Sequence, residues 1–126
     1  MLANSKAYNG FAIDDVGRAT EFYGQTLGLK VEVLDEENGL LMLHLGGDRP
    51  TLVYRKPDFT PATYTILNFA VDDIDAAVEK LSARGVVFER YDGFDQDEKG
   101  IARGPGPKIA WFKDPAGNIL SVLEEG

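Results

Sequence analysis

The 126-residue sequence predicts an α+β fold made of two copies of one βαβββ module. The first observation is an internal repeat, because Phe11–Ala19 and Phe69–Ala77 share a short β-rich run, paired aspartates and an apolar helix start at the same spacing. The second is a helical spacing of apolar residues directly after each aspartate pair, and the third is a set of strand-like runs after each helix.

Both predicted helices begin after an aspartate that can act as an N-cap. Asp15 precedes a helix over Val16–Leu27, and Asp73 precedes one over Ile74–Leu81. A carboxylate at this position accepts hydrogen bonds from the free N–H groups of the first turn. Its negative charge is also stabilised by the positive end of the helix dipole. Each helix is predicted to end at a glycine, which adopts a left-handed conformation readily. These glycines are Gly28 and Gly85.

Three strand-like runs follow each helix, separated by turn-forming residues. They are Lys30–Leu34, Leu40–Leu45 and Thr51–Arg55 in the first half, and Val86–Tyr91, Ile109–Phe112 and Ile119–Leu123 in the second. Lys56–Pro61, with two prolines, is the predicted linker inside a single domain, with module 1 at about 6–56 and module 2 at about 62–126. The long connection 92–107 either borders a ligand site or is a solvated excursion.

Three motifs resemble the vicinal oxygen chelate superfamily, which includes glyoxalase I, bleomycin-resistance proteins, fosfomycin-modifying enzymes and extradiol dioxygenases. They lie at Ile13–Leu29, Val71–Ala77 and Trp111–Leu120, in the family's order along nearly the whole chain. The resemblance implies that the modules pair their sheets into a U-shaped mixed-sheet trough, with helices outside and the ligand inside. It also implies a homodimer, because small members with two modules commonly pair.

Alternation along the strands assigns residues to the two faces independently of the resemblance. Phe11, Ile13, Leu41 and Leu43 are predicted to be core residues, and their neighbours face the trough. The resulting lining is aromatic and weakly polar, as in many small-molecule pockets. The predicted substrate-binding residues are Tyr8, His44, Leu52, Tyr54, Tyr64, Ile66, Asn68, Trp111 and Ser121.

The positions at which metal-using relatives have their ligands hold residues in this chain that are poor ligands for a metal ion. Metal-using relatives place His, Glu or Gln on four trough-facing strands, where this chain has Tyr8, Ile66, Ser121 and, at or near the fourth, Leu52. The one imidazole, His44, lies on a different strand, and a single histidine does not make a His-rich site. The sequence therefore predicts no metal and no cofactor.

The amino-acid composition excludes several classes of binding partner. With 13 Lys and Arg against 21 Asp and Glu, the net charge of -8 opposes binding to nucleic acid or to an anionic membrane. The chain has no cysteine, which excludes disulfides and thiolate chemistry. The start of the chain lacks the pattern of an export signal, and no apolar run reaches the roughly 20 residues of a membrane span, so a cytoplasmic location is expected.

These observations favour a metal-independent small-molecule-binding protein that sequesters an aromatic or cationic compound. One alternative is a divergent lyase, isomerase or transferase with an unrecognised metal, or with His44 as general base and a tyrosine as electrophilic partner. Another is a regulatory or immunity module whose trough is occluded.

Overall fold

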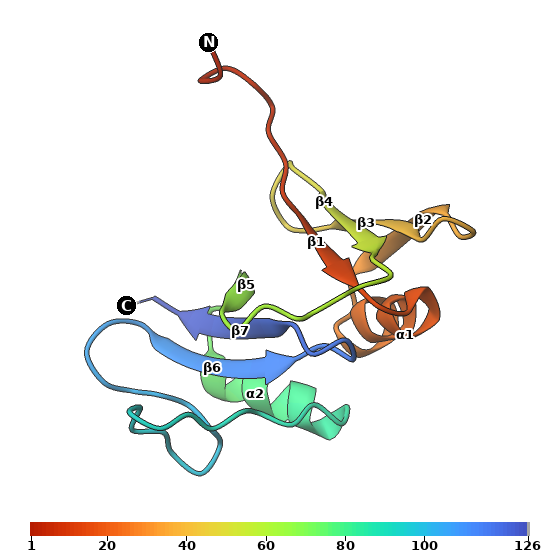
Figure 1. The fold of residues 1–126 in the computed structure, drawn as a ribbon. Coiled ribbons are helices and arrows are strands. Elements are labelled where there is room, and N and C mark those ends of the chain that lie inside the picture. The colour runs from red at the N-terminus through yellow and green to blue at the C-terminus, as the bar shows by residue number, and fades with distance from the viewer. Residues whose placement is uncertain (126) are drawn as a thin grey trace. The chain divides into compact units, whose positions relative to one another are not determined.

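The computed structural model describes residues 1–125, which form two compact units (Figure 1). The boundary between them in the sequence lies between Thr60 and Pro61. The boundary falls inside the predicted linker. The first unit contains β1 (Gly10–Ile13), α1 (Val16–Glu21), the π-helical turn η1 (Phe22–Thr26), β2 (Lys30–Asp35), β3 (Leu40–His44) and β4 (Thr51–Arg55). The second contains β5 (Thr65–Ala70), α2 (Ile74–Ala83), β6 (Lys108–Lys113) and β7 (Ile119–Glu124).

The first unit is a four-stranded mixed sheet with a helix on one face. Its strand order is β1-β4-β3-β2, and the β1–β4 pair is parallel while the other pairs are antiparallel. Apolar side chains alternate along the strands as expected, because one face must be buried under the helix. The predicted core residues Phe11, Ile13, Leu41 and Leu43 are all buried, together with Tyr23.

The second unit repeats this topology for three of the four strands. Its strand order is β5-β7-β6, with β5 and β7 parallel and β6 and β7 antiparallel. In Figure 1, α2 lies along one face of this sheet. Ile74 and Val78 of α2 are buried, as are Phe112, Leu120 and Val122 on the strands. Among residues 1–125, no helix is long and apolar enough to cross a membrane.

Both predicted N-caps are confirmed. The carboxylate of Asp15 accepts a hydrogen bond from Arg18 N at 3.0 Å, and that of Asp73 accepts one from Ala76 N at 3.1 Å. The positive φ angles of Gly28 and Gly85 confirm the predicted helix ends. The first helix differs from the second, since its last turn is π-helical, with Leu27 N donating to the carbonyl of Phe22.

The prediction of a regular strand over Val86–Tyr91 is wrong. In place of a strand, the segment 86–91 forms an isolated bridge, Phe88 to Phe112, which includes the hydrogen bond from Glu89 N to Trp111 O at 2.8 Å. The reason lies in a side chain, because Gln96 accepts from Tyr91 N at 2.9 Å and donates to Glu89 O at 2.9 Å. The amide of Gln96 therefore occupies backbone groups that a longer ladder would use.

Candidate functional site

Each sheet has an open face, defined here as the face opposite its helix. Strand register places one residue of each strand in a row across this face. In the first unit the row is Gly10, Leu52, Met42 and Glu32; in the second it is Asn68, Ser121, Trp111 and Glu89. Because the strands are repeat equivalents, the members of the two rows correspond one to one.

Register also fixes the fourth position at which relatives hold a metal ligand. Leu52 pairs with Gly10 just as Ser121 pairs with Asn68, so Leu52 is the repeat equivalent of Ser121. Neither side chain is a usual ligand for a divalent ion, and neither are Tyr8 and Ile66. Within residues 1–125, no three His, Cys, Asp or Glu side chains converge as a metal site requires. The residues at these positions do not fit a divalent metal.

His44 lies on the open face of the first unit and contacts a carboxylate that sequence reasoning missed. Its Nε2 is 2.9 Å from Oε1 of Glu32 on the neighbouring strand, and both side chains are partly exposed. A carboxylate in this position orients the imidazole by accepting a hydrogen bond from its ring nitrogen. Alternation of β2 places Glu32 on the same face as Lys30, which pairs with His44, so the contact was accessible to sequence reasoning.

The tyrosines predicted to line the site are exposed. Tyr54 pairs with Leu40, four residues along β3 from His44 and thus about 13 Å away. Tyr54 is therefore not a direct partner of His44 within its unit. Tyr8 precedes β1 and is 61% exposed, and Tyr64 precedes β5 and is 69% exposed. Such exposed aromatic side chains are free to contact a ligand or another chain.

In the second unit, a polar pair adjoins an aromatic cluster. Ser121 is fully buried and its hydroxyl donates to Oδ1 of Asn68 at 2.5 Å. Trp111, beside Ser121 in the row, contacts Tyr91 with ring centroids 5.4 Å apart and Phe94 with centroids 4.9 Å apart. Phe94 is nevertheless 55% exposed. Tyr91, Phe94 and Trp111 are called the aromatic cluster below.

Sequence reasoning identified Trp111 but not the other two members of the aromatic cluster. Tyr91 directly precedes the long connection, and Phe94 lies near its start. An aromatic residue in an otherwise polar loop was the sequence feature that could have indicated a ligand contact there. Burial is the main cause that raises the pKa of Tyr91, so its phenol stays neutral. The hydroxyl is buried and has no hydrogen-bond partner among residues 1–125. Beside it, Glu89 and Lys113 form an ion pair of 3.5 Å.

Ile66 is the remaining predicted residue, and it lies where the β5–β7 register shifts between Thr65 and Leu67. It is partly buried. Ile66 is the extra residue of this bulge, and it interrupts the alternation of faces along β5. The structure thus brings Asn68, Trp111 and Ser121 together in one unit, and places His44, Leu52 and Tyr54 on one face of the other.

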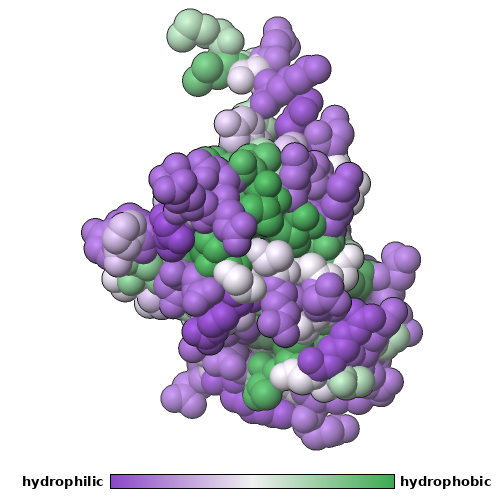
Figure 2. Space-filling model, turned by 90° about the vertical axis from the view of Figure 1, so that its right-hand side faces the viewer, coloured by the Kyte–Doolittle hydropathy of each residue, from purple (hydrophilic) through white to green (hydrophobic). Residues whose placement is uncertain are grey.

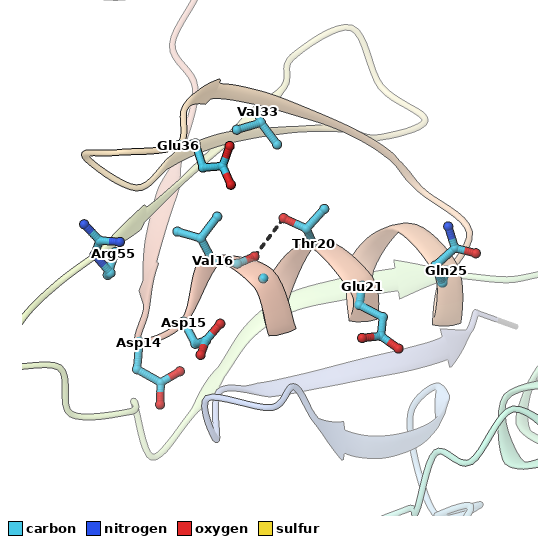
Figure 3. A pocket seen from close by; sticks show the side chains of 10 residues that line it. Asp14, Asp15, Val16, Thr20, Glu21, Gln25, Val33, Glu36 and Arg55 are labelled. Carbon is cyan, nitrogen blue, oxygen red and sulfur yellow. Dashed lines mark hydrogen bonds between the residues drawn. The ribbon is translucent and has the colours of Figure 1, made fainter.

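A groove of about 700 Å³ lies on the helix side of the first unit, between α1 and β2. Figure 2 views this side and shows hydrophobic surface bordered by hydrophilic side chains. In the close view, Val16 on the helix and Val33 on the strand face each other across the groove, and Thr20 donates its hydroxyl to the Val16 carbonyl at 2.7 Å (Figure 3). Carboxylates line the rim. None of the predicted ligand residues lies in this groove, so we place the candidate site on the open faces instead.

Comparison with known families identifies the fold. The family model described as Glyoxalase/Bleomycin resistance protein/Dioxygenase superfamily matches residues 7–122. The chain belongs to this superfamily. Among curated proteins, none matches the chain.

Solved structures with a similar fold cover nearly the whole chain. An antibiotic-binding protein, TnmS3 from Streptomyces sp. CB03234, is 23% identical with a TM-score of 0.71, covering 98% of both chains. A putative glyoxalase family protein from Bacillus anthracis is 22% identical with a TM-score of 0.72, covering 100% of both chains. A lactoylglutathione lyase from Agrobacterium tumefaciens is 23% identical with a TM-score of 0.65, covering 97% of this chain and 95% of its own. At these identities the likeness shows the fold alone.

Proposed function

We propose that this protein is a metal-independent small-molecule-binding protein of the superfamily, which holds a flat aromatic compound. The aromatic cluster on the second unit carries the proposal, because Phe94 keeps 55% of its surface exposed while packed against Trp111. An exposed ring held in place offers a stacking surface, and the adjacent Asn68 offers polar atoms that orient a ligand. The antibiotic-binding relative from Streptomyces is consistent with this reading.

Charge favours a neutral or cationic ligand over an anionic one. The chain carries a net charge of -8, and Asp92 and Asp95 flank Phe94 in the sequence. Lys113, which lies near the Tyr91 phenol, is paired with Glu89 at 3.5 Å. An anionic ring would therefore meet carboxylates at the aromatic cluster and a lysine that is already neutralised by Glu89.

The single tryptophan makes the test direct. Titration with 2-naphthol, naphthylmethylammonium and 1-naphthalenesulfonate compares one ring system in neutral, cationic and anionic form, and Trp111 fluorescence reports binding. We expect saturable quenching by the first two and weaker binding of the sulfonate. Val87→Ala is the matched control, since Val87 is an exposed apolar residue near the cluster in sequence but not part of it. Absence of any saturable response would contradict the proposal.

The pair formed by Glu32 and His44 supports a second candidate function, a divergent enzyme with His44 as general base. The 2.9 Å contact gives His44 the orienting carboxylate that catalytic histidines use. Elemental analysis of protein purified without chelator, followed by assays for lactoylglutathione lyase activity of wild type, His44→Ala and Glu32→Gln, separates the candidates. Turnover that both variants lose supports the enzyme, and stoichiometric Zn, Ni, Mn or Fe would overturn the metal-independent proposal.

We also propose that the protein forms a homodimer. The large exposed rings of Tyr8, Tyr54 and Tyr64 are supporting features, because exposed aromatic side chains are enriched where protein surfaces meet. Sedimentation velocity at micromolar concentration is the test. A monomer under those conditions would contradict the proposed dimer. The proposal that the second unit binds a ligand would be unaffected, because its aromatic cluster lies within one unit.

A further inference from the structure

The long connection 92–107 is organised by two side chains rather than left to solvent. Gln96 is the first of them. Its Oε1 accepts from Tyr91 N at 2.9 Å, and its Nε2 donates to the carbonyls of Glu89 at 2.9 Å and Gly100 at 2.8 Å. One amide thus ties both ends of a tight loop segment together.

Asp97 is the second organising side chain. Its Oδ1 accepts from the backbone N–H groups of Lys99 and Ile101, each at 2.9 Å, and its Oδ2 accepts from Arg103 Nε at 2.9 Å. Burial opposes ionisation of Asp97, but these hydrogen bonds and Arg103 lower its pKa overall. Ile101, whose N–H is bound in this way, is fully buried and anchors the loop in the unit's core.

Ion pairs then fasten the loop to α2. Arg103 donates from its second terminal nitrogen to Oδ1 of Asp75 at 2.6 Å. Lys99 Nζ lies 2.7 Å from Glu79 Oε1 and 3.3 Å from Asp75 Oδ1. The loop is therefore held from two sides, by its own hydrogen bonds and by the helix.

The held segment carries Phe94. Phe94 N donates to Tyr91 O at 3.4 Å, and the intervening Gly93 has a positive φ of 91°. That turn sets the ring of Phe94 against Trp111, although Phe94 as a residue is 55% exposed. Apolar burial alone does not account for a fixed ring at this exposure, so the loop framework must supply the restraint.

We propose that Asp97 is a positioning residue for the ligand site, fixing Phe94 against Trp111 before a flat ligand stacks on them. The inference rests on the proposed function of this aromatic cluster. A loop already in its bound conformation spares the ligand the entropy of ordering it, and binding is tighter for that reason. The Asp97 carboxylate acts only through the loop, because its three recorded partners are all loop residues.

Asp97→Asn tests the role, with Glu98→Gln as a matched control that makes the same charge change at an exposed site of the same loop. In the absence of any ligand, we expect Asp97→Asn to shift Trp111 emission as Phe94 leaves the indole, while Glu98→Gln leaves emission unchanged. With 2-naphthol as probe, we expect binding to weaken about five- to tenfold for Asp97→Asn and less than twofold for Glu98→Gln.

A double-mutant cycle separates positioning from general stability. In a Phe94→Ala background, Asp97→Asn should weaken 2-naphthol binding by no further amount, whereas independent effects would multiply. Unchanged Trp111 emission and unchanged affinity in Asp97→Asn would overturn the inference while the proposed function stands. A wild-type protein that binds no probe would overturn the function, and the ligand-free emission of the variant would still decide the positioning role. Arg103→Gln provides a milder second variant if Asp97→Asn does not fold.

Discussion

The two units share a topology and differ mainly in one connection. In the first unit, β2 and β3 are joined by a tight turn in which Asp35 accepts from Asn38 N at 3.0 Å. The turn requires glycine at position 39, where φ is +74° and a Cβ would lie 2.6 Å from Cβ of Arg55. In the second unit, the corresponding connection is the loop 92–107, which brings Phe94 to the open face.

This difference shows how a duplicated module can acquire separate surfaces without a change of sheet. The open face of the first unit carries the contact between His44 and Glu32 and the exposed ring of Tyr54. On the second unit, Trp111 is covered by rings from the loop and its flank. The side chains that distinguish the two units therefore lie in the connections and on the open faces, while the strands give both units the same framework.

The largest expected effect compares the two cores. Leu43 and Phe112 are repeat equivalents, each one residue beyond the row on the helix side, and both are fully buried. Leu43→Ala should lower the free energy of unfolding by about 2–5 kcal/mol and Phe112→Ala by about 3–5 kcal/mol. Urea denaturation measures both, with exposed Val87→Ala as the near-neutral control. A loss below about 1 kcal/mol for either would show that its core tolerates the cavity.

The next effect asks which open face binds the ligand. Phe94→Ala should weaken 2-naphthol binding about five- to tenfold, because it removes a stacking partner of Trp111. Tyr54→Ala on the first unit should change the affinity less than twofold. Fluorescence titration gives both constants, and the reverse order would move the site to the first unit.

A smaller effect compares the two N-caps. Asp15→Ala and Asp73→Ala each remove one carboxylate hydrogen bond to a first-turn N–H group, of 3.0 and 3.1 Å. Each should cost about 1 kcal/mol of unfolding free energy in urea denaturation. The second helix has another acceptor, since Glu124 accepts from Ile74 N at 2.9 Å. A combined Asp73→Ala and Glu124→Gln variant should therefore lose more stability than either single change.

The smallest effect is a difference in acid sensitivity. The hydrogen bond from Ile74 N, followed by that from Lys108, lowers the pKa of Glu124 below 4.5. A lowered folded-state pKa stabilises the fold above the unfolded value and loses that stabilisation as the pH falls through the folded value. The first unit has Arg55 at the equivalent position. Glu124→Gln should therefore flatten the fall in melting temperature between about pH 5 and pH 3. An unchanged slope would contradict the contribution.

Local chemistry made the helices and most strands predictable. Asp15, Asp73, Gly28 and Gly85 mark helix limits through hydrogen bonds and φ angles that depend on near neighbours. The segment 86–91 was predicted as a regular strand because its residues favour one, but the side chain of Gln96 takes up its backbone groups. A side chain that replaces a strand partner leaves no periodic signal in the sequence.

The site was predictable only where alternation decides it. Alternation placed His44 and Ser121 on the open faces, and the register agrees. Alternation did not indicate that Ser121 would be fully buried beside Trp111, or that Phe94 would reach that tryptophan. The position of Phe94 depends on the path of the loop 92–107, which is held by its own hydrogen bonds and by ion pairs to α2.

The contact between His44 and Glu32 has a counterpart in the second unit. Lys113 lies two residues beyond Trp111, as His44 lies two beyond Met42, and each base contacts the glutamate of its own row, Glu89 or Glu32. An imidazole is a flat ring with one polar atom on each of two sides, whereas a lysine ammonium is a flexible point charge with three donors. The two units therefore hold the glutamate at corresponding positions with different donor geometry, which gives their open faces different shapes at this point.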